Sequence, residues 1–231
     1  LPAVLLLLDF WPLRRFGPGA LSARQAVPRL LLEKIPFFLL GGLAAGGTVW
    51  GHHVVSGEIP VPLLLRIQSI PLSYGFYLLK TVWPLDLTVL YPHWSIWLSR
   101  PQALALVFSS GVLLLTLSFF AWRSRQRIPS QWVGWLWFLV MLLPVCGLIP
   151  IPSNDVADRF SYLPGMGLSI ALLFLHASHQ RYHRSWRWLR PLLSLLALAL
   201  LSLLTLRQLP AWQSATSLTA RRVAVPTHSP R

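Results

Sequence analysis

Long apolar runs separated by short arginine-rich connections are the feature that most constrains this chain. A helix that crosses a bilayer needs about 20 predominantly apolar residues, and fewer where flanking aromatic and arginine side chains reach the interface. Six segments reach or approach this length: Leu1–Leu13, Ile35–Val55, Ala103–Trp122, Trp132–Ile149, Tyr162–His176 and Leu192–Leu206. The pattern predicts an all-α fold, a polytopic membrane bundle of about six transmembrane helices, and it argues against a water-soluble domain.

The composition agrees with lipid as the main solvent. Charged residues make up 11% of the chain, against about 25% in an ordinary soluble domain. The formal net charge of +14 is compatible with nucleic acid, but the basic residues stand in short clusters between the apolar runs, as membrane-flanking residues do. We therefore expect no nucleic-acid partner. The single cysteine, Cys146, lies in an apolar run and provides neither a disulfide framework nor a thiol metal site.

The connections alternate in charge, which predicts the topology. Connections 14–34, 123–127 and 181–190 hold twelve of the twenty basic residues, and the positive-inside rule places them in the cytoplasm. Glu33 and Lys34 are expected to pair there. The opposite side receives 57–100, 150–161 and the tail from Arg207. Segment 57–100 is rich in aromatic residues and proline, which suits a helix in the interface plane or a re-entrant segment. Residues 1–206 then form the membrane domain and 207–231 an outer tail.

The outer connection 150–164 concentrates polar side chains at the start of a predicted helix. It contains Asp155, Asp158, Arg159 and Tyr162. Because arginine binds phosphate in a bidentate manner and keeps its charge, this group suits the headgroup of an anionic lipid phosphate. The alternative is a local Asp158–Arg159 salt bridge that only orients the next helix.

Further polar residues lie on the same predicted side. Lys80, Asp86 and His93 fit either a wall over an outer cavity or an interfacial helix whose charges face water. No metal site is expected at His176, His179 and His183, because neighbouring arginines oppose a cation. Gly42 and Gly46 form a G-x-x-x-G pattern that allows close helix packing.

Five stretches carry a resemblance to a known family. They are L-L-L-L-D-F-W-P-L-R-R (5–15), L-L-E-K-I-P-F-F (31–38), K-T-V-W-P-L-D-L-T-V-L-Y-P-H (80–93), G-W-L-W-F (134–138) and A-D-R-F-S-Y-L-P (157–164). In this order they resemble the membrane region of the transmembrane and tetratricopeptide-repeat-containing O-mannosyltransferase family and its bacterial relatives. The resemblance implies a GT-C-like membrane fold. Residues 206–218 are similar to the approach to that family's first tetratricopeptide repeat.

The resemblance also implies an activity: transfer of a sugar, mannose, from a polyprenyl-phosphate donor to a protein hydroxyl on the outer or lumenal side. Arg159 and Lys80 would hold the donor phosphate, Asp158 would orient Arg159, and Tyr162 or His93 would line the acceptor path. The family usually has tyrosine where this chain has Phe160.

The key acids of GT-C enzymes lie in the first outer loop, which we expect upstream of Leu1, so the catalytic base is expected outside this fragment and the fragment alone is expected to be inactive. The lipid-linked sugar is the donor substrate, and no other cofactor or metal is expected. The expected partners are membrane lipid, the donor and an acceptor protein, in a bacterial inner membrane or the endoplasmic reticulum membrane.

Two other functions remain open. The first is a non-enzymatic membrane anchor, or scaffold, for external repeat domains; it predicts that polar outer residues tolerate alanine. The second is a transporter or lipid flippase, which we rank last because the predicted spans contain few ionisable residues.

Overall fold

The computed structural model describes residues 2–15, 23–56, 62–84, 91, 94, 98–147, 156–179 and 189–212. Its helices in chain order are α1 (Pro2–Phe10), α2 (Ala23–Ser56), α3 (Leu63–Val82), α5 (Arg100–Ser124), α6 (Pro129–Leu142), η1 (Leu143–Val145), η2 (Asp158–Ser161), α7 (Tyr162–His179), α8 (Leu189–Gln208) and η4 (Leu209–Trp212). Apart from one isolated antiparallel bridge between Tyr91 and Val156, the described residues form helices, turns and short connections. The all-α prediction is confirmed.

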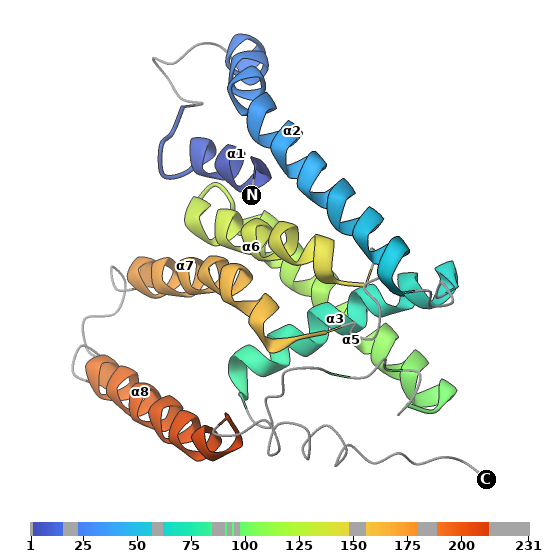
Figure 1. The fold of residues 1–231 in the computed structure, drawn as a ribbon. Helices are drawn as coiled ribbons and strands as arrows, with labels where there is room; N and C mark the ends of the chain where they lie inside the picture. Colours follow the sequence, from blue (N-terminus) through green and yellow to red (C-terminus); the bar gives the residue numbers. More distant parts are fainter. Residues whose placement is uncertain are drawn as a thin grey trace.

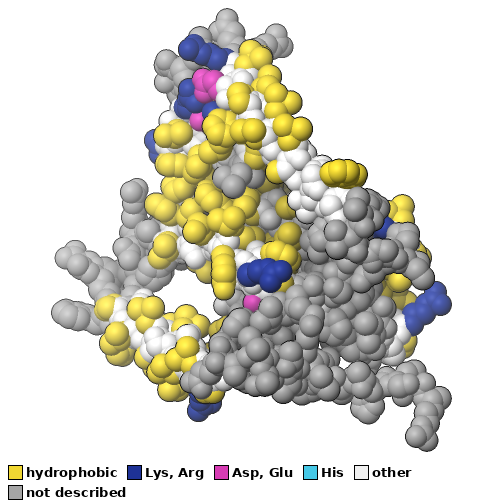
Figure 2. Space-filling model, in the orientation of Figure 1, with side chains coloured by type: hydrophobic (Ala, Val, Ile, Leu, Met, Phe, Trp, Pro, Cys, Tyr) yellow, Lys and Arg dark blue, Asp and Glu magenta, His cyan; other side chains and the backbone are white. Residues whose placement is uncertain are grey.

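In the part of the chain that the structure describes, two helices are long and apolar enough to cross a membrane: Val27–Thr48 within α2, and α5. Only 11% and 6% of their most apolar stretches are buried, whereas the core helix of a soluble protein would be mostly covered. Figure 2 shows hydrophobic side chains spread over α2 and the neighbouring helices. Residues 129–145 and 194–208 form apolar helices that are shorter. Because two of the described helices qualify as spans, the presence of six spans stays a prediction.

The core forms where α3, α5, α6 and α7 meet. Its buried members include Tyr74, Tyr77, Trp135, Phe138 and Leu142. At the contact between α6 and α7, a Cβ built at Gly167 would lie 2.6 Å from the carbonyl oxygen of Gly134. Since real Cβ atoms do not approach an oxygen so closely, these two helices pack backbone against backbone. By contrast, nothing in the described part of the chain lies within 4 Å of a Cβ built at Gly42 or Gly46.

Helix α3 is the main described element of the predicted outer segment 57–100, and it contributes directly to the core. It packs on α5 (Figure 1). Its buried face carries Ser69, Ser73, Tyr74 and Tyr77. These residues recur at helical spacing on one side, which explains why the segment joins the bundle instead of lying over it.

The ends of the helices fall on two sides of the molecule. In Figure 1 the end of α1, the start of α2, the turn from α5 to α6, the end of α7 and the start of α8 lie toward the top and left. We call this the arginine end, because Arg14, Arg15, Arg123, Arg125 and Arg127 belong to it. The opposite side, where α3 ends and α7 begins, is called the mouth end. The predicted placement of the connections on two sides of a membrane stays a prediction.

Candidate functional site

Tyr91 ties two distant segments together at the mouth end. Its hydroxyl donates toward Asp158, 3.2 Å from both Oδ1 and Oδ2. Its backbone N–H donates to the carbonyl oxygen of Val156 at 3.4 Å, and its ring packs edge-on against Phe76 with centroids 4.8 Å apart. The Asp158 carboxylate is thereby fixed against the side of α3.

Lys80 shares this tyrosine with Asp158. Its Nζ lies 5.5 Å from the centroid of the Phe76 ring and 5.9 Å from that of the Tyr91 ring, within the range of cation–π attraction. The structure thus brings two of the predicted site residues together: Lys80 lies over the ring of Tyr91, and Asp158 accepts a hydrogen bond from its hydroxyl.

Tyr77 fixes the residue that precedes Asp158. Its hydroxyl donates to the carbonyl oxygen of Ala157 at 3.1 Å and accepts from the Ala157 N–H at 3.2 Å. Tyr77 is 1% exposed and Ala157 is fully buried. Burial raises the pKa of the Tyr77 phenol, with the neighbouring Asp158 charge acting in the same direction, so the group stays protonated at physiological pH.

Arg159 and Tyr162 project from a tight turn beside this anchor. The 3₁₀ turn η2 is held by a hydrogen bond from the Ser161 hydroxyl to the Asp158 carbonyl oxygen at 2.6 Å. Arg159 is exposed, and its guanidinium carbon lies 5.2 Å from the centroid of Phe160. Tyr162 is 72% exposed at the start of α7. Within the described residues no ion pair joins Asp158 to Arg159, so the local salt bridge considered above is not formed there.

Other predicted residues lie outside the described residues: His93, Asp86 and Asp155. The sequence did not single out Tyr77 and Tyr91 as site residues. The signal that could have found them is weak, because both stand in an aromatic-rich segment typical of a membrane interface.

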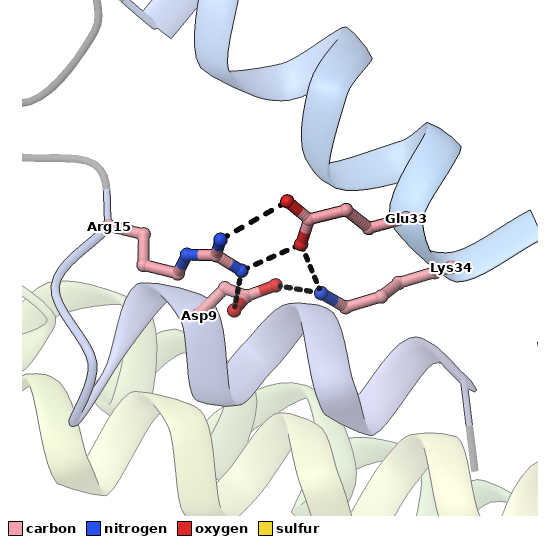
Figure 3. A network of polar contacts seen from close by, with 4 residues as sticks. All are labelled: Asp9, Arg15, Glu33 and Lys34. Carbon is pink, nitrogen blue, oxygen red and sulfur yellow. Dashed lines mark hydrogen bonds and ion pairs between the residues drawn. The ribbon is translucent and has the colours of Figure 1, made fainter.

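A second polar centre lies at the arginine end, between α1 and α2 (Figure 3). The predicted Glu33–Lys34 pair is confirmed, with 3.3 Å between Lys34 Nζ and Glu33 Oε2. Asp9 and Arg15 join this pair to form a cluster of four charged side chains. Asp9 was missed, although a single acid in an apolar run is itself a signal, since charge is costly beside lipid.

The mouth site has the chemistry of an anion-binding surface. It offers the ammonium of Lys80 and the exposed guanidinium of Arg159, and arginine favours phosphate and carboxylate. Among the residues that the structure describes, Asp158 is the only carboxylate at this end, and Tyr91 binds it. These residues are therefore suited to binding and orienting an anion, and they do not form a pair of catalytic carboxylates.

Comparison with known proteins adds no relative. Neither protein-family models, nor curated proteins, nor solved structures gave a match to this chain.

Proposed function

We propose that this chain belongs to a membrane glycosyltransferase that moves a sugar, mannose, from a polyprenyl-phosphate donor to a protein hydroxyl on the outer or lumenal side. The observation that supports it is the meeting of Lys80 and Asp158 on one tyrosine, with Arg159 exposed beside them. This polar group stands at one end of a molecule whose long helices expose apolar side chains.

The donor has two chemical parts, and both have a counterpart here. The phosphate matches Lys80 and Arg159. The isoprenoid chain matches the apolar surface of α7, which begins three residues after Arg159 and exposes Leu163 and Met166 in its first turns. A charged surface that continues directly into an apolar one suits an amphiphile better than a free phosphate.

In the proposed reaction the bond between the anomeric carbon and the phosphate oxygen breaks, and the acceptor oxygen bonds to that carbon. The acceptor proton passes to a carboxylate that we place outside this chain. Lys80 and Arg159 offset the charge that grows on the departing phosphate. Asp158 holds the η2 turn through Tyr91, and the role of lining the acceptor path falls to Tyr162 or His93.

The test is Arg159→Ala in the full-length protein, assayed for transfer from a lipid-linked donor. Loss of a charge-assisted hydrogen bond of about 1.5–3 kcal/mol predicts a fall in transfer of roughly tenfold to a hundredfold. The transfer rate of Arg159→Lys should lie between those of the wild type and the alanine variant, since lysine keeps the positive charge but lacks the planar guanidinium that binds phosphate with two hydrogen bonds. Arg125→Ala is the matched control, because Arg125 stacks on Trp122 at the arginine end. Unchanged transfer by a normally expressed Arg159→Ala protein would refute the proposal and favour the anchor or scaffold.

A further inference from the structure

Four charged side chains close a ring between α1 and α2 (Figure 3). Arg15 Nη1 lies 3.1 Å from Asp9 Oδ1 and 2.9 Å from Glu33 Oε2. Lys34 Nζ lies 2.9 Å from Asp9 Oδ2 and 3.3 Å from Glu33 Oε2. Each of the two cations contacts both acids. Because two positive charges face two negative ones, the ring carries no net charge.

The ring has a buried half and an exposed half. Asp9 is 2% exposed and Lys34 is 8% exposed, whereas the side chains of Arg15 and Glu33 are 41% and 35% exposed. A buried charge that loses its partner is strongly destabilising, while an exposed pair contributes little. The Asp9–Lys34 pair therefore holds the larger share of any energetic coupling between the helices.

Helix α2 depends on this contact. Among the described helices it packs mainly on α1. Near its middle, a Cβ built at Gly41 would lie 3.8 Å from the side chain of Pro2 in α1. Farther along, a Cβ built at Gly46 or Gly47 would meet nothing described within 4 Å. Helix α1 in turn packs on α6, and Trp11 just beyond it meets Phe174 of α7 edge-on with centroids 4.8 Å apart. The path from α2 to the core thus runs through α1.

We infer that the four-charge ring is a clasp that fastens α2 to the bundle at the arginine end and leaves its far half able to change neighbours. The inference is independent of the proposed glycosyl transfer. A clasp differs from an ordinary surface ion pair in one respect: opening it releases α2 while the α6–α7 core stays folded.

The test is hydrogen exchange, followed by mass spectrometry, on the full chain in detergent micelles. Asp9→Asn leaves the buried Lys34 ammonium with the half-exposed Glu33 as its remaining carboxylate partner in the ring. Exchange in 35–48 should therefore rise about tenfold or more. Exchange in α6 should stay as in the wild type. Arg29→Gln is the matched control on the same helix, because Arg29 is exposed and pairs with no described residue.

The double variant Asp9→Asn/Lys34→Met decides between a clasp and general damage. It removes both buried charges and keeps the exposed Arg15–Glu33 pair, so its α2 exchange should lie closer to the wild type than that of Asp9→Asn. If Asp9→Asn does not fold, Lys34→Met serves in its place, since Asp9 keeps Arg15 and a smaller rise confined to α2 is expected. Unchanged α2 exchange in the single variants, equal acceleration in α6, or a double variant as fast as the two singles combined would overturn the inference.

Discussion

Replacing Tyr77 by phenylalanine removes one oxygen that serves both polar backbone groups of Ala157. The ring stays in place, packed edge-on against Phe76 with centroids 5.6 Å apart. The Ala157 carbonyl oxygen keeps the N–H of Phe160 at 3.0 Å, but the Ala157 N–H loses the partner described for it. A buried donor left without a partner costs about 1–3 kcal/mol, and the weakened carbonyl adds about 0.5–1 kcal/mol. We expect the free energy of unfolding to fall by about 1.5–4 kcal/mol.

Tyr74→Phe is the matched control. The Tyr74 hydroxyl donates to the Leu139 carbonyl oxygen at 2.5 Å, and that oxygen also accepts the N–H of Leu143. Its loss leaves no buried backbone group unpaired, so the expected cost is about 1 kcal/mol. Denaturant or thermal unfolding of both variants in one detergent measures the difference. A Tyr77→Phe loss no larger than that of Tyr74→Phe would show that Tyr77 does not anchor the turn before Asp158.

Two glycine substitutions test the backbone contacts by the same unfolding measurement. Gly167→Ala should destabilise by about 1–3 kcal/mol, because its Cβ would force α7 away from Gly134 and Trp137; Gly165→Ala, which meets nothing described within 4 Å, should not. Gly147→Ala should cost about 1–2 kcal/mol, because Gly147 has a φ of 94° and its Cβ would lie 2.8 Å from that of Ser69. A stable Gly167→Ala protein would argue against backbone packing of α6 on α7, and a stable Gly147→Ala protein against a strict glycine requirement there.

The all-α architecture could be predicted because apolar runs and basic clusters are local features. Asp158 and Arg159 could be named as candidates for a similar reason, since adjacent charges at the start of an apolar helix are conspicuous. Tyr77 and Tyr91 were not found. Their partners lie 80 and 67 residues away, and aromatic residues near a predicted interface already have a sufficient explanation. Asp9 is a comparable case, because its role depends on Lys34 from the next helix.

The number of spans could not be settled by counting apolar residues. Helix α6 ends at Leu142, where η1 begins and Pro144 follows, so the apolar stretch outlasts the regular helix. Helix α3 shows the reverse, since a segment with Arg66 and Lys80 still buries one face. Packing with neighbours, which no single segment reveals, decides both cases.

The glycine contact between α6 and α7 has a mechanical consequence for the mouth site. Backbone atoms that touch directly allow neither sliding nor rotation without a clash, because no side chain between them can change rotamer and absorb the movement. We expect α6 and α7 to move together as one rigid unit. The turn Asp158–Ser161 leads directly into α7. The Asp158–Arg159 turn therefore extends from a helix that packs backbone against backbone on its neighbour, and we expect a ligand that binds there to adapt to the turn.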